Sequence, residues 1–265
     1  MALSAIPASA GSIYSVFYDD RFGIIDDSTG AFTQISTLPI AQSGGIAYDN
    51  GTLYTQSIQS ELISVDPISG ASSVIGTSGL QLTSVGFAGG YNGLFEVDSM
   101  SNLYSINPNT GASQLVGATG LGPNYQSWDT SLSDSGTELY FTAGGAGAID
   151  QLYGINPATG VATDFGSTGV TGIAGSAIVS GYLELFQYNA GTDHIYSAPL
   201  GSTDFTAISV LGAQIVDGGT LLETPTAQNV SSAAVPEPFS ILLMGSSLIA
   251  LGLWAWLRVA KKRRP

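Results

Sequence analysis

Carboxylates are the side chains of this sequence with most scope for chemistry, because the chain has 20 acids, one histidine and no cysteine. Asp129 follows Trp128 in a stretch expected to be an inner β-strand, and Asp217 lies near another such stretch. Two carboxylates flanking a sugar could act as acid and base in glycoside hydrolysis, and the Trp128 indole could stack on the sugar ring. A core tryptophan beside a solvated acid is the structural alternative.

Other catalytic and metal-binding arrangements find less support. His194 stands alone at an expected strand start, so it cannot form a multi-histidine metal site, and no serine elbow accompanies it. The glycine-rich stretch 144–148 lacks the lysine of a phosphate-binding loop. Four acids fall in expected turns, where their oxygens cap backbone N–H groups: Asp26, Asp49, Asp66 and Asp134. Turn oxygens could also bind a structural Ca²⁺, although no calcium-loop pattern is present, and we expect no cofactor.

Charge is distributed very unevenly along the chain. Residues 1–238 contain all 20 acids and a single base, Arg21, which gives them a formal charge of −19. The other five bases lie in the last eight residues. Such an acidic surface repels nucleic acid and anionic membranes and is typical of a secreted domain, so we expect no nucleic-acid partner.

A stretch of sequence that recurs along the chain predicts the scaffold on which any functional residues must lie. It reads Asn102–Ala112, and it recurs at Glu61–Ala71 and Gln151–Val161, with eroded copies at Phe22–Ala31 and His194–Gly201. Alternating apolar residues predict a half-buried strand, and Asn-Pro or Asp-Pro opens a turn. The closing glycine is expected to adopt positive φ, so each copy predicts a β-hairpin.

The spacing of the repeats predicts an all-β, five-bladed β-propeller, with four to six blades possible. The turn residues Gly30, Gly70, Gly111 and Gly160 are 40, 41 and 49 residues apart, and about four short strands fit each unit. One blade is split between the two ends of the predicted domain, residues 13–222. We expect Gln214–Leu222 to supply its missing innermost strand by pairing with Ile13–Phe17, for example through Ile215.

In its repeats the chain resembles bacterial β-propeller repeats that read L-Y-x-I-[N/D]-P-x-T-G. The resemblance covers residues 13–222 and implies the fold. It does not imply a reaction, because propellers carry lectins, hydrolases, lyases and inert scaffolds alike.

The N-terminal residues 1–12 predict either a residual leader or a flexible N-terminus. Ala8-Ser-Ala10 fits the small-x-small cleavage pattern of a signal peptide. Neither a basic n-region nor a full apolar h-region precedes it, so whether a complete signal peptide lies ahead of Met1 stays open.

The C-terminal region predicts a membrane anchor. A polar linker, residues 223–234, leads into residues 235–265, where nineteen uncharged residues, 239–257, follow Val235-Pro-Glu-Pro238. At about 1.5 Å per residue this segment is long enough to cross a bilayer as one helix. The positive-inside rule places the basic residues that follow it in the cytoplasm: Arg258, Lys261, Lys262, Arg263 and Arg264.

This order of three parts closely resembles the PEP-CTERM sorting tail of Gram-negative bacteria, with Pro236, Glu237 and Pro238 as the sorting motif. The resemblance implies an exosortase-type membrane transpeptidase as partner, in cells that make exopolysaccharide and biofilm. It also implies anchoring in the inner membrane before processing, and then a place at the cell surface or in the extracellular matrix. The alternative is a permanent single-pass anchor.

Together these features predict a non-enzymatic, exported propeller protein that is structural, adhesive or glycan-binding. The alternative is a secreted glycan-active hydrolase or lyase on the same scaffold, with Trp128 and Asp129 at its glycan site. Two carboxylates about 5–10 Å apart at the mouth of the channel would favour the enzyme. Scattered acids would favour the scaffold.

Overall fold

The computed structural model describes residues 11–17, 19–39, 43–49, 52–57, 59–80, 86–89, 93–122, 130–144, 147–188, 192–211 and 222–223. All of them belong to the first of the two units into which the chain divides, Met1–Thr224 and Pro225–Pro265. The predicted transmembrane helix, residues 239–257, lies outside the described residues.

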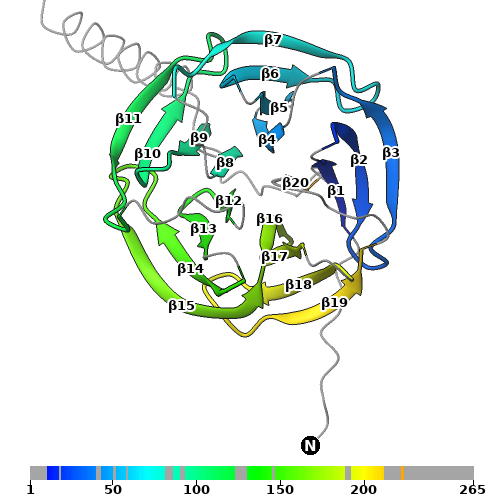
Figure 1. Ribbon diagram of the computed structural model, residues 1–265, viewed down its shortest axis with the longest axis vertical. Helices are drawn as coiled ribbons and strands as arrows, with labels where there is room; N and C mark the ends of the chain where they lie inside the picture. The colour runs from blue at the N-terminus through cyan, green and yellow to red at the C-terminus, as the bar shows by residue number, and fades with distance from the viewer. Residues whose placement is uncertain are drawn as a thin grey trace, which may run out of the picture. The chain divides into compact units, whose positions relative to one another are not determined.

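Five antiparallel sheets of four strands each surround a central axis, so the prediction of a five-bladed β-propeller is confirmed (Figure 1). We number the blades along the chain. Blade 1 contains β20 (Leu222–Glu223), β1 (Ser12–Val16), β2 (Arg21–Asp26) and β3 (Phe32–Thr37), from the axis outward. Blade 2 contains β4 (Ser43–Asp49), β5 (Thr52–Ser57), β6 (Glu61–Val65) and β7 (Ser72–Thr77).

The other three blades repeat this order of strands. Blade 3 contains β8 (Gly86–Gly89), β9 (Leu94–Val97), β10 (Asn102–Ile106) and β11 (Ser113–Ala118). Blade 4 contains β12 (Thr130–Asp134), β13 (Leu139–Ala143), β14 (Ile149–Ile155) and β15 (Ala162–Thr171). Blade 5 contains β16 (Ile173–Val179), β17 (Tyr182–Gln187), β18 (His194–Pro199) and β19 (Thr206–Val210).

Strands from both ends of the propeller close the ring. β20 pairs with β1 in antiparallel register, with Leu222 opposite Tyr14 and Glu223 opposite Ile13. The two segments lie side by side in Figure 1, although more than 200 residues separate them in sequence. The predicted return of the C-terminal strand to blade 1 is therefore confirmed through Leu222, whereas Ile215 lies outside the described residues.

The repeated stretches form the hairpin between the third and fourth strands of each blade. Gly30, Gly70, Gly111 and Gly160 all have positive φ, between 69° and 78°, which confirms the prediction for these turns. In each turn the glycine N–H donates to the backbone oxygen of the Asp or Asn that opens the turn, at 2.7–2.8 Å.

The outermost strand of every blade carries a β-bulge at the same place. The burial pattern of β3, β7 and β11 is identical, and β15 begins with it too. In each of the five hairpins the register shifts by one residue. The residue skipped is apolar and turns inward onto the core: Ile35, Ile75, Val116, Phe165 and Ile208.

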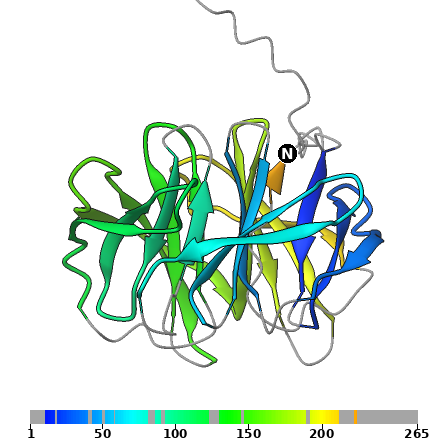
Figure 2. The same ribbon diagram turned by 90° about the horizontal axis from the view of Figure 1, so that it is seen from above.

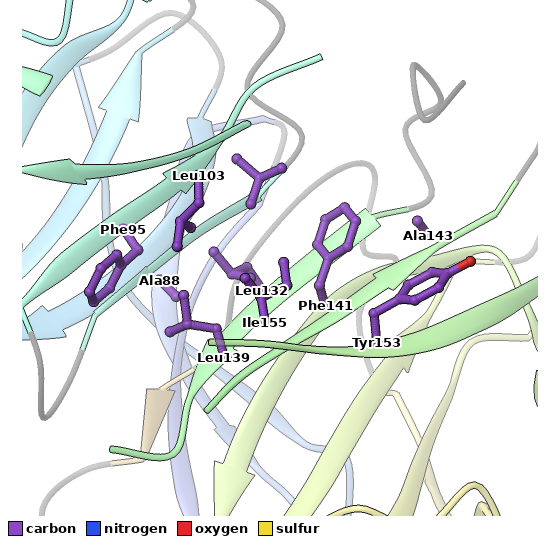
Figure 3. Close-up of a cluster of buried hydrophobic side chains, with 10 residues drawn as sticks. Ala88, Phe95, Leu103, Leu132, Leu139, Phe141, Ala143, Tyr153 and Ile155 are labelled. Atoms are coloured by element: carbon purple, nitrogen blue, oxygen red, sulfur yellow. The ribbon is translucent and has the colours of Figure 1, made fainter. Parts of the chain in front are cut away.

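The core consists of five apolar clusters, one between each pair of neighbouring blades. Between blades 1 and 5, Ile13 and Phe17 pack with Val179 and Phe186. Figure 3 shows the cluster between blades 3 and 4, in which Phe95 and Leu103 meet Leu132, Phe141 and their neighbours. The ring is therefore stabilised at each junction by burial of apolar surface between sheets.

Close backbone approach joins most neighbouring blades at the rim. A Cβ atom added to Gly111 of blade 3 would lie 2.7 Å from the carbonyl carbon of Gly76 in blade 2. Gly160 meets Gly117 of blade 3 in the same way, with the Gly117 carbonyl oxygen at 2.8 Å. Only glycine fits these positions, because it adopts positive φ without strain and has no Cβ atom to collide with the neighbouring backbone. In blades 1 to 4 the turn thus rests on the outer strand of the neighbouring blade that precedes it around the ring.

The junction between blades 4 and 5 is built differently. Gly201 has positive φ, but no atom lies within 4 Å of a Cβ atom placed on it. Larger apolar side chains pack here against the core cluster instead, namely Phe165, Leu200 and Phe205. Blade 5 therefore departs from the repeat at the place where its sequence copy, His194–Gly201, is weakest.

Candidate functional site

Most of the residues predicted to be functional lie outside the described part of the chain. These are Trp128, Asp129 and Asp217, the sorting motif Pro236–Pro238, and the basic residues between Arg258 and Arg264. In the described part, no helix is long and apolar enough to span a membrane. The chemistry that the structure does describe belongs to the two innermost strands of the blades.

A buried pair of polar side chains connects blades 2 and 3. Gln56 lies on β5 and Glu96 on β9, and they are 2% and 1% exposed. The Gln56 Nε2 donates a hydrogen bond of 2.8 Å to the Glu96 Oε2. Side chains alternate between the two faces of a strand, and Gln56 and Glu96 lie on the faces of β5 and β9 that meet between the two blades. A hydrogen bond in the low-dielectric interior is stronger than one in water, so this pair fixes two blades relative to each other.

Blades 4 and 5 meet through hydroxyl groups. The Oγ atoms of Ser133 on β12 and Ser176 on β16 are 2.6 Å apart, and both residues are buried. Within blade 4, the Ser131 Oγ lies 2.6 Å from the Thr142 Oγ1. Glu184 on β17 is a second glutamate with little exposure, at 3%. The propeller therefore has a polar interior between its apolar clusters.

The positions of the nearly unexposed glutamates can be compared between the blades. Glu96 lies in blade 3 and Glu184 in blade 5, with blade 4 between them. Among the residues that the structure describes, no three His, Asp or Glu side chains gather into a possible metal site. The two nearly unexposed glutamates therefore lie on blades that are not neighbours.

Replacement of Glu96 tests the role of the buried pair. We expect Glu96→Ala to lower the free energy of unfolding by about 2–3 kcal/mol, because the buried Gln56 amide loses its acceptor. Glu96→Gln keeps an acceptor oxygen and should cost less. Urea denaturation of both variants measures the difference. Equal losses for the two variants would contradict the structural role of the hydrogen bond.

Three of the four predicted turn acids, Asp26, Asp66 and Asp134, cap backbone groups as the sequence predicts. The Asp66 Oδ1 accepts hydrogen bonds from the backbone N–H groups of Ile68 and Ser69. The Asp26 Oδ1 accepts from the N–H and the hydroxyl of Thr29. These bonds favour the ionised form, so hydrogen bonding from Ser69 lowers the pKa of Asp66, and bonds from Ser28 and Thr29 lower the pKa of Asp26.

One recurring position was missed by the reasoning from sequence. It is the residue just before the third strand in blades 2 and 3, and the second residue of the third strand in blade 4. Its side chain binds the crossover to the next blade. The hydroxyl groups of Ser60 and Ser101 donate to the backbone oxygens of Leu80 and Gly122. In blade 4, the buried Asp150 Oδ2 accepts from the Ile173 N–H at 2.9 Å. The signal was present as a small polar residue directly ahead of the copies that begin at Glu61, Asn102 and Gln151.

Arg21, the single base of the propeller, contacts an acid and an aromatic ring. The Arg21 Nε lies 2.6 Å from the Asp19 Oδ2, and its guanidinium carbon lies 4.8 Å from the centre of the Phe17 ring. His194 begins β18, half-buried, with its ring 6.0 Å from that of Tyr196. The strand start expected at His194 is thus confirmed.

No protein family and no curated protein matches this chain. Among solved structures it is similar to a chain in the crystal structure of a nidogen/laminin complex, with 10% identity and a TM-score of 0.54. The similarity covers 79% of this chain and 98% of that one. It is also similar to extracellular domains of a one-component and a hybrid two-component system from B. thetaiotaomicron, with 13% and 14% identity and TM-scores of 0.44 and 0.43.

The B. thetaiotaomicron similarities cover 76% and 77% of this chain but only 27% and 26% of those chains. At such low identity the similarity to the nidogen/laminin structure concerns the fold alone. The similarity to the nidogen/laminin structure agrees with the five-bladed all-β architecture.

Proposed function

We propose that this chain is an exported, non-enzymatic propeller protein, sorted through its C-terminal tail to the cell surface or the exopolysaccharide matrix. The tail carries this proposal. Pro236-Glu-Pro238, the apolar stretch 239–257 and the terminal basic cluster occur in the order of a PEP-CTERM tail. An exosortase-type transpeptidase in the inner membrane would be the partner that reads it.

The surface of the propeller supports export and a role in contact with glycans. The outermost strands form most of the rim in Figure 1 and contain a single charged residue, Asp164. Their exposed side chains are mainly hydroxyls and amides, such as Thr33, Gln34 and Ser73, with some aliphatic groups such as Val74 and Leu115. Hydroxyl and amide groups can form hydrogen bonds with the hydroxyl groups of neutral sugars. Because the outer strands carry one acid, they would also repel an acidic polysaccharide less than the rest of the acidic surface does.

A hydrolase or lyase on the same scaffold is the second candidate. Two nearly unexposed glutamates on second strands, Glu96 and Glu184, are the observation that favours it. Incubation with the host polysaccharide distinguishes the two functions, since release of reducing ends that is lost in Glu96→Gln or Glu184→Gln would establish an enzyme. Binding of the polysaccharide without release of reducing ends would support the scaffold.

Substitution of the sorting motif tests the export proposal. We expect Pro236→Ala with Pro238→Ala to block removal of the tail in a host with an exosortase. The two prolines favour an extended peptide that a membrane protease can reach, and alanine removes that constraint. Mass spectrometry of C-terminal peptides from surface-released protein is the measurement. Recovery of intact Leu257–Pro265 on the released wild-type protein would show that the tail is a plain anchor.

A further inference from the structure

Blade 1 differs from the other repeats at one position. In three repeats the residue after the opening Asp or Asn of the turn is a proline, Pro67, Pro108 or Pro157. In blade 1 this residue is Asp27. It is 1% exposed, whereas the opening Asp26 beside it is part of the exposed turn network. A buried carboxylate has thus replaced an apolar ring at the junction that closes the propeller.

Asp27 connects three segments that meet at this junction. The Gly11 N–H donates a hydrogen bond of 2.7 Å to the Asp27 Oδ1, and the Asp27 N–H donates to the Gly11 oxygen at 3.2 Å. The Ser209 Oγ of blade 5 donates to the Asp27 backbone oxygen at 2.8 Å. The start of the propeller and its last full strand are therefore both attached to one residue.

The second oxygen of this carboxylate lies next to Gly11. Within the described residues the Asp27 Oδ2 is buried and accepts no hydrogen bond. A Cβ atom placed on Gly11 would lie 3.0 Å from this oxygen and 2.9 Å from the Val179 Cγ1. The pocket around Gly11 thus accommodates glycine and little else. An uncompensated buried carboxylate oxygen costs stability, and burial accordingly raises the pKa of Asp27.

Gly11 directly follows the expected leader cleavage pattern Ala8-Ser-Ala10. We propose that hydrolysis of the Ala10–Gly11 peptide bond during export creates an α-ammonium group on Gly11, which forms a buried ion pair with Asp27 and stabilises the closed ring. This inference rests on the proposed export. In the hydrolysis, water adds across the peptide bond, Ala10 leaves as a carboxylate, and Gly11 gains the protonated amine.

The ammonium group suits this site better than the amide that it replaces. An amide offers one N–H, which Asp27 Oδ1 already accepts, whereas an ammonium offers three donors and a positive charge. A small rotation of the terminal group can direct a second donor to Oδ2. Charge-assisted hydrogen bonds are roughly twice as strong as neutral ones, so processing converts a costly buried charge into a compensated pair.

The pair has a defined pH range. Asp26 is the titratable neighbour that acts on Asp27, while β16 and β19 contribute Val179 and Ser209, which do not titrate. In the processed chain the ion pair needs an ionised carboxyl group, so its gain in stability is present above the unfolded carboxyl pKa of about 3.9. It also needs a protonated amine. The pair raises the pKa of the α-amino group above its unfolded value of about 8, and the gain in stability is lost as the pH rises through this raised pKa. In the unprocessed chain the raised pKa of Asp27 has the opposite effect, because stability then increases as the pH falls toward 4.

Three forms of the chain in the same detergent test the proposal. One begins at Gly11, made by removal of an initiator methionine; the second is this form with its α-amine acetylated; the third begins at Met1. At pH 7 we expect the free-amine form to melt about 4 °C or more above both others. At pH 10 this difference should disappear. Equal melting temperatures of the free and acetylated forms between pH 5 and 8 would overturn the proposal.

Asp27→Asn supplies the matched variant. It should lower the melting temperature of the free-amine form but not that of the acetylated form, because asparagine keeps an oxygen for Gly11 and removes the buried charge. Loss of stability in both forms would instead make Asp27 a purely structural residue and contradict the ion pair. If the variant does not fold, the pH series on the wild-type forms still decides.

Failure of export and failure of the ion pair are distinguishable. A complete leader is fused ahead of Ala8, and the N-terminal residue of the exported protein is identified by mass spectrometry. An N-terminal Gly11 in a chain whose amine has no effect on stability would leave export standing and remove the ion pair. Retention of the chain in the cytoplasm would remove the proposed function, while the three purified forms still test the pair.

Discussion

Gly111→Ala should lower the free energy of unfolding by about 3 kcal/mol or more, a large part of the stability of an ordinary domain. Two costs combine in this variant. Alanine is strained at a φ of 74°, and its Cβ atom would lie 2.7 Å from the carbonyl carbon of Gly76 and 2.9 Å from the Thr77 nitrogen. Both neighbours are backbone atoms of blade 2, so blades 2 and 3 must move apart.

Gly201→Ala is the matched control for this variant. Its φ of 78° imposes the same backbone strain, but no atom lies within 4 Å of the added Cβ. We expect a cost of about 1 kcal/mol, which is the conformational term alone. Guanidinium denaturation, followed by far-UV circular dichroism, measures the free energy of unfolding of both variants. Equal costs at the two positions would show that close approach between blades does not contribute to stability.

Phe141→Ala should cost about 3–5 kcal/mol, the usual range for removing a fully buried aromatic side chain. Phe141 is 0% exposed and lies in the cluster between blades 3 and 4 (Figure 3). The variant loses the transfer free energy of the ring and leaves a cavity between two sheets. Because these sheets are held by hydrogen bonds within each blade, they can only partly collapse into the space.

Leu115→Ala, in the outer strand of blade 3, is the control for Phe141→Ala. Leu115 is 57% exposed, so we expect a change within about 0.5 kcal/mol. Thermal melts and urea titrations of both variants give the comparison. A loss below about 1.5 kcal/mol for Phe141→Ala would mean that the junctions between blades tolerate repacking and that the apolar clusters do not hold the ring.

The blades could be predicted from sequence because their turns depend on local chemistry. Asp66, Asn107 and Asn156 each open a turn whose closing glycine needs positive φ, and that requirement leaves a visible spacing in the sequence. Closure through Leu222 could also be predicted, since blade 1 lacked one strand. These inferences depend on residues close together in sequence or on counting strands.

Contacts between blades could not be predicted in the same way. Gln56 and Glu96 lie 40 residues apart, and nothing in either strand alone indicates that their side chains meet. Asp27 seemed an erosion of the repeat, because its partners Gly11 and Ser209 are recognisable only once the ring is closed. The turn of blade 5 likewise reads as a weak copy of the repeat. In the structure its Leu200 and Phe205 pack against the core cluster between blades 4 and 5, in place of the close contact made by the other turns.

The bulges in the outer strands have a consequence for molecules held at high concentration. Each blade ends in an outer strand, and such strands are templates on which other chains can polymerise when they carry few charges. Figure 2 shows one of these outer strands, β7, in cyan across the front of the ring. Here the displaced residue, for example Ile75 or Val116, interrupts the row of backbone groups about halfway along the strand. Such a bulge also increases the twist of the strand. An incoming strand can then match only a few residues before it loses register. We therefore expect a rim with Asp164 as the single charge of its outer strands to resist fibril formation even when the protein is densely packed.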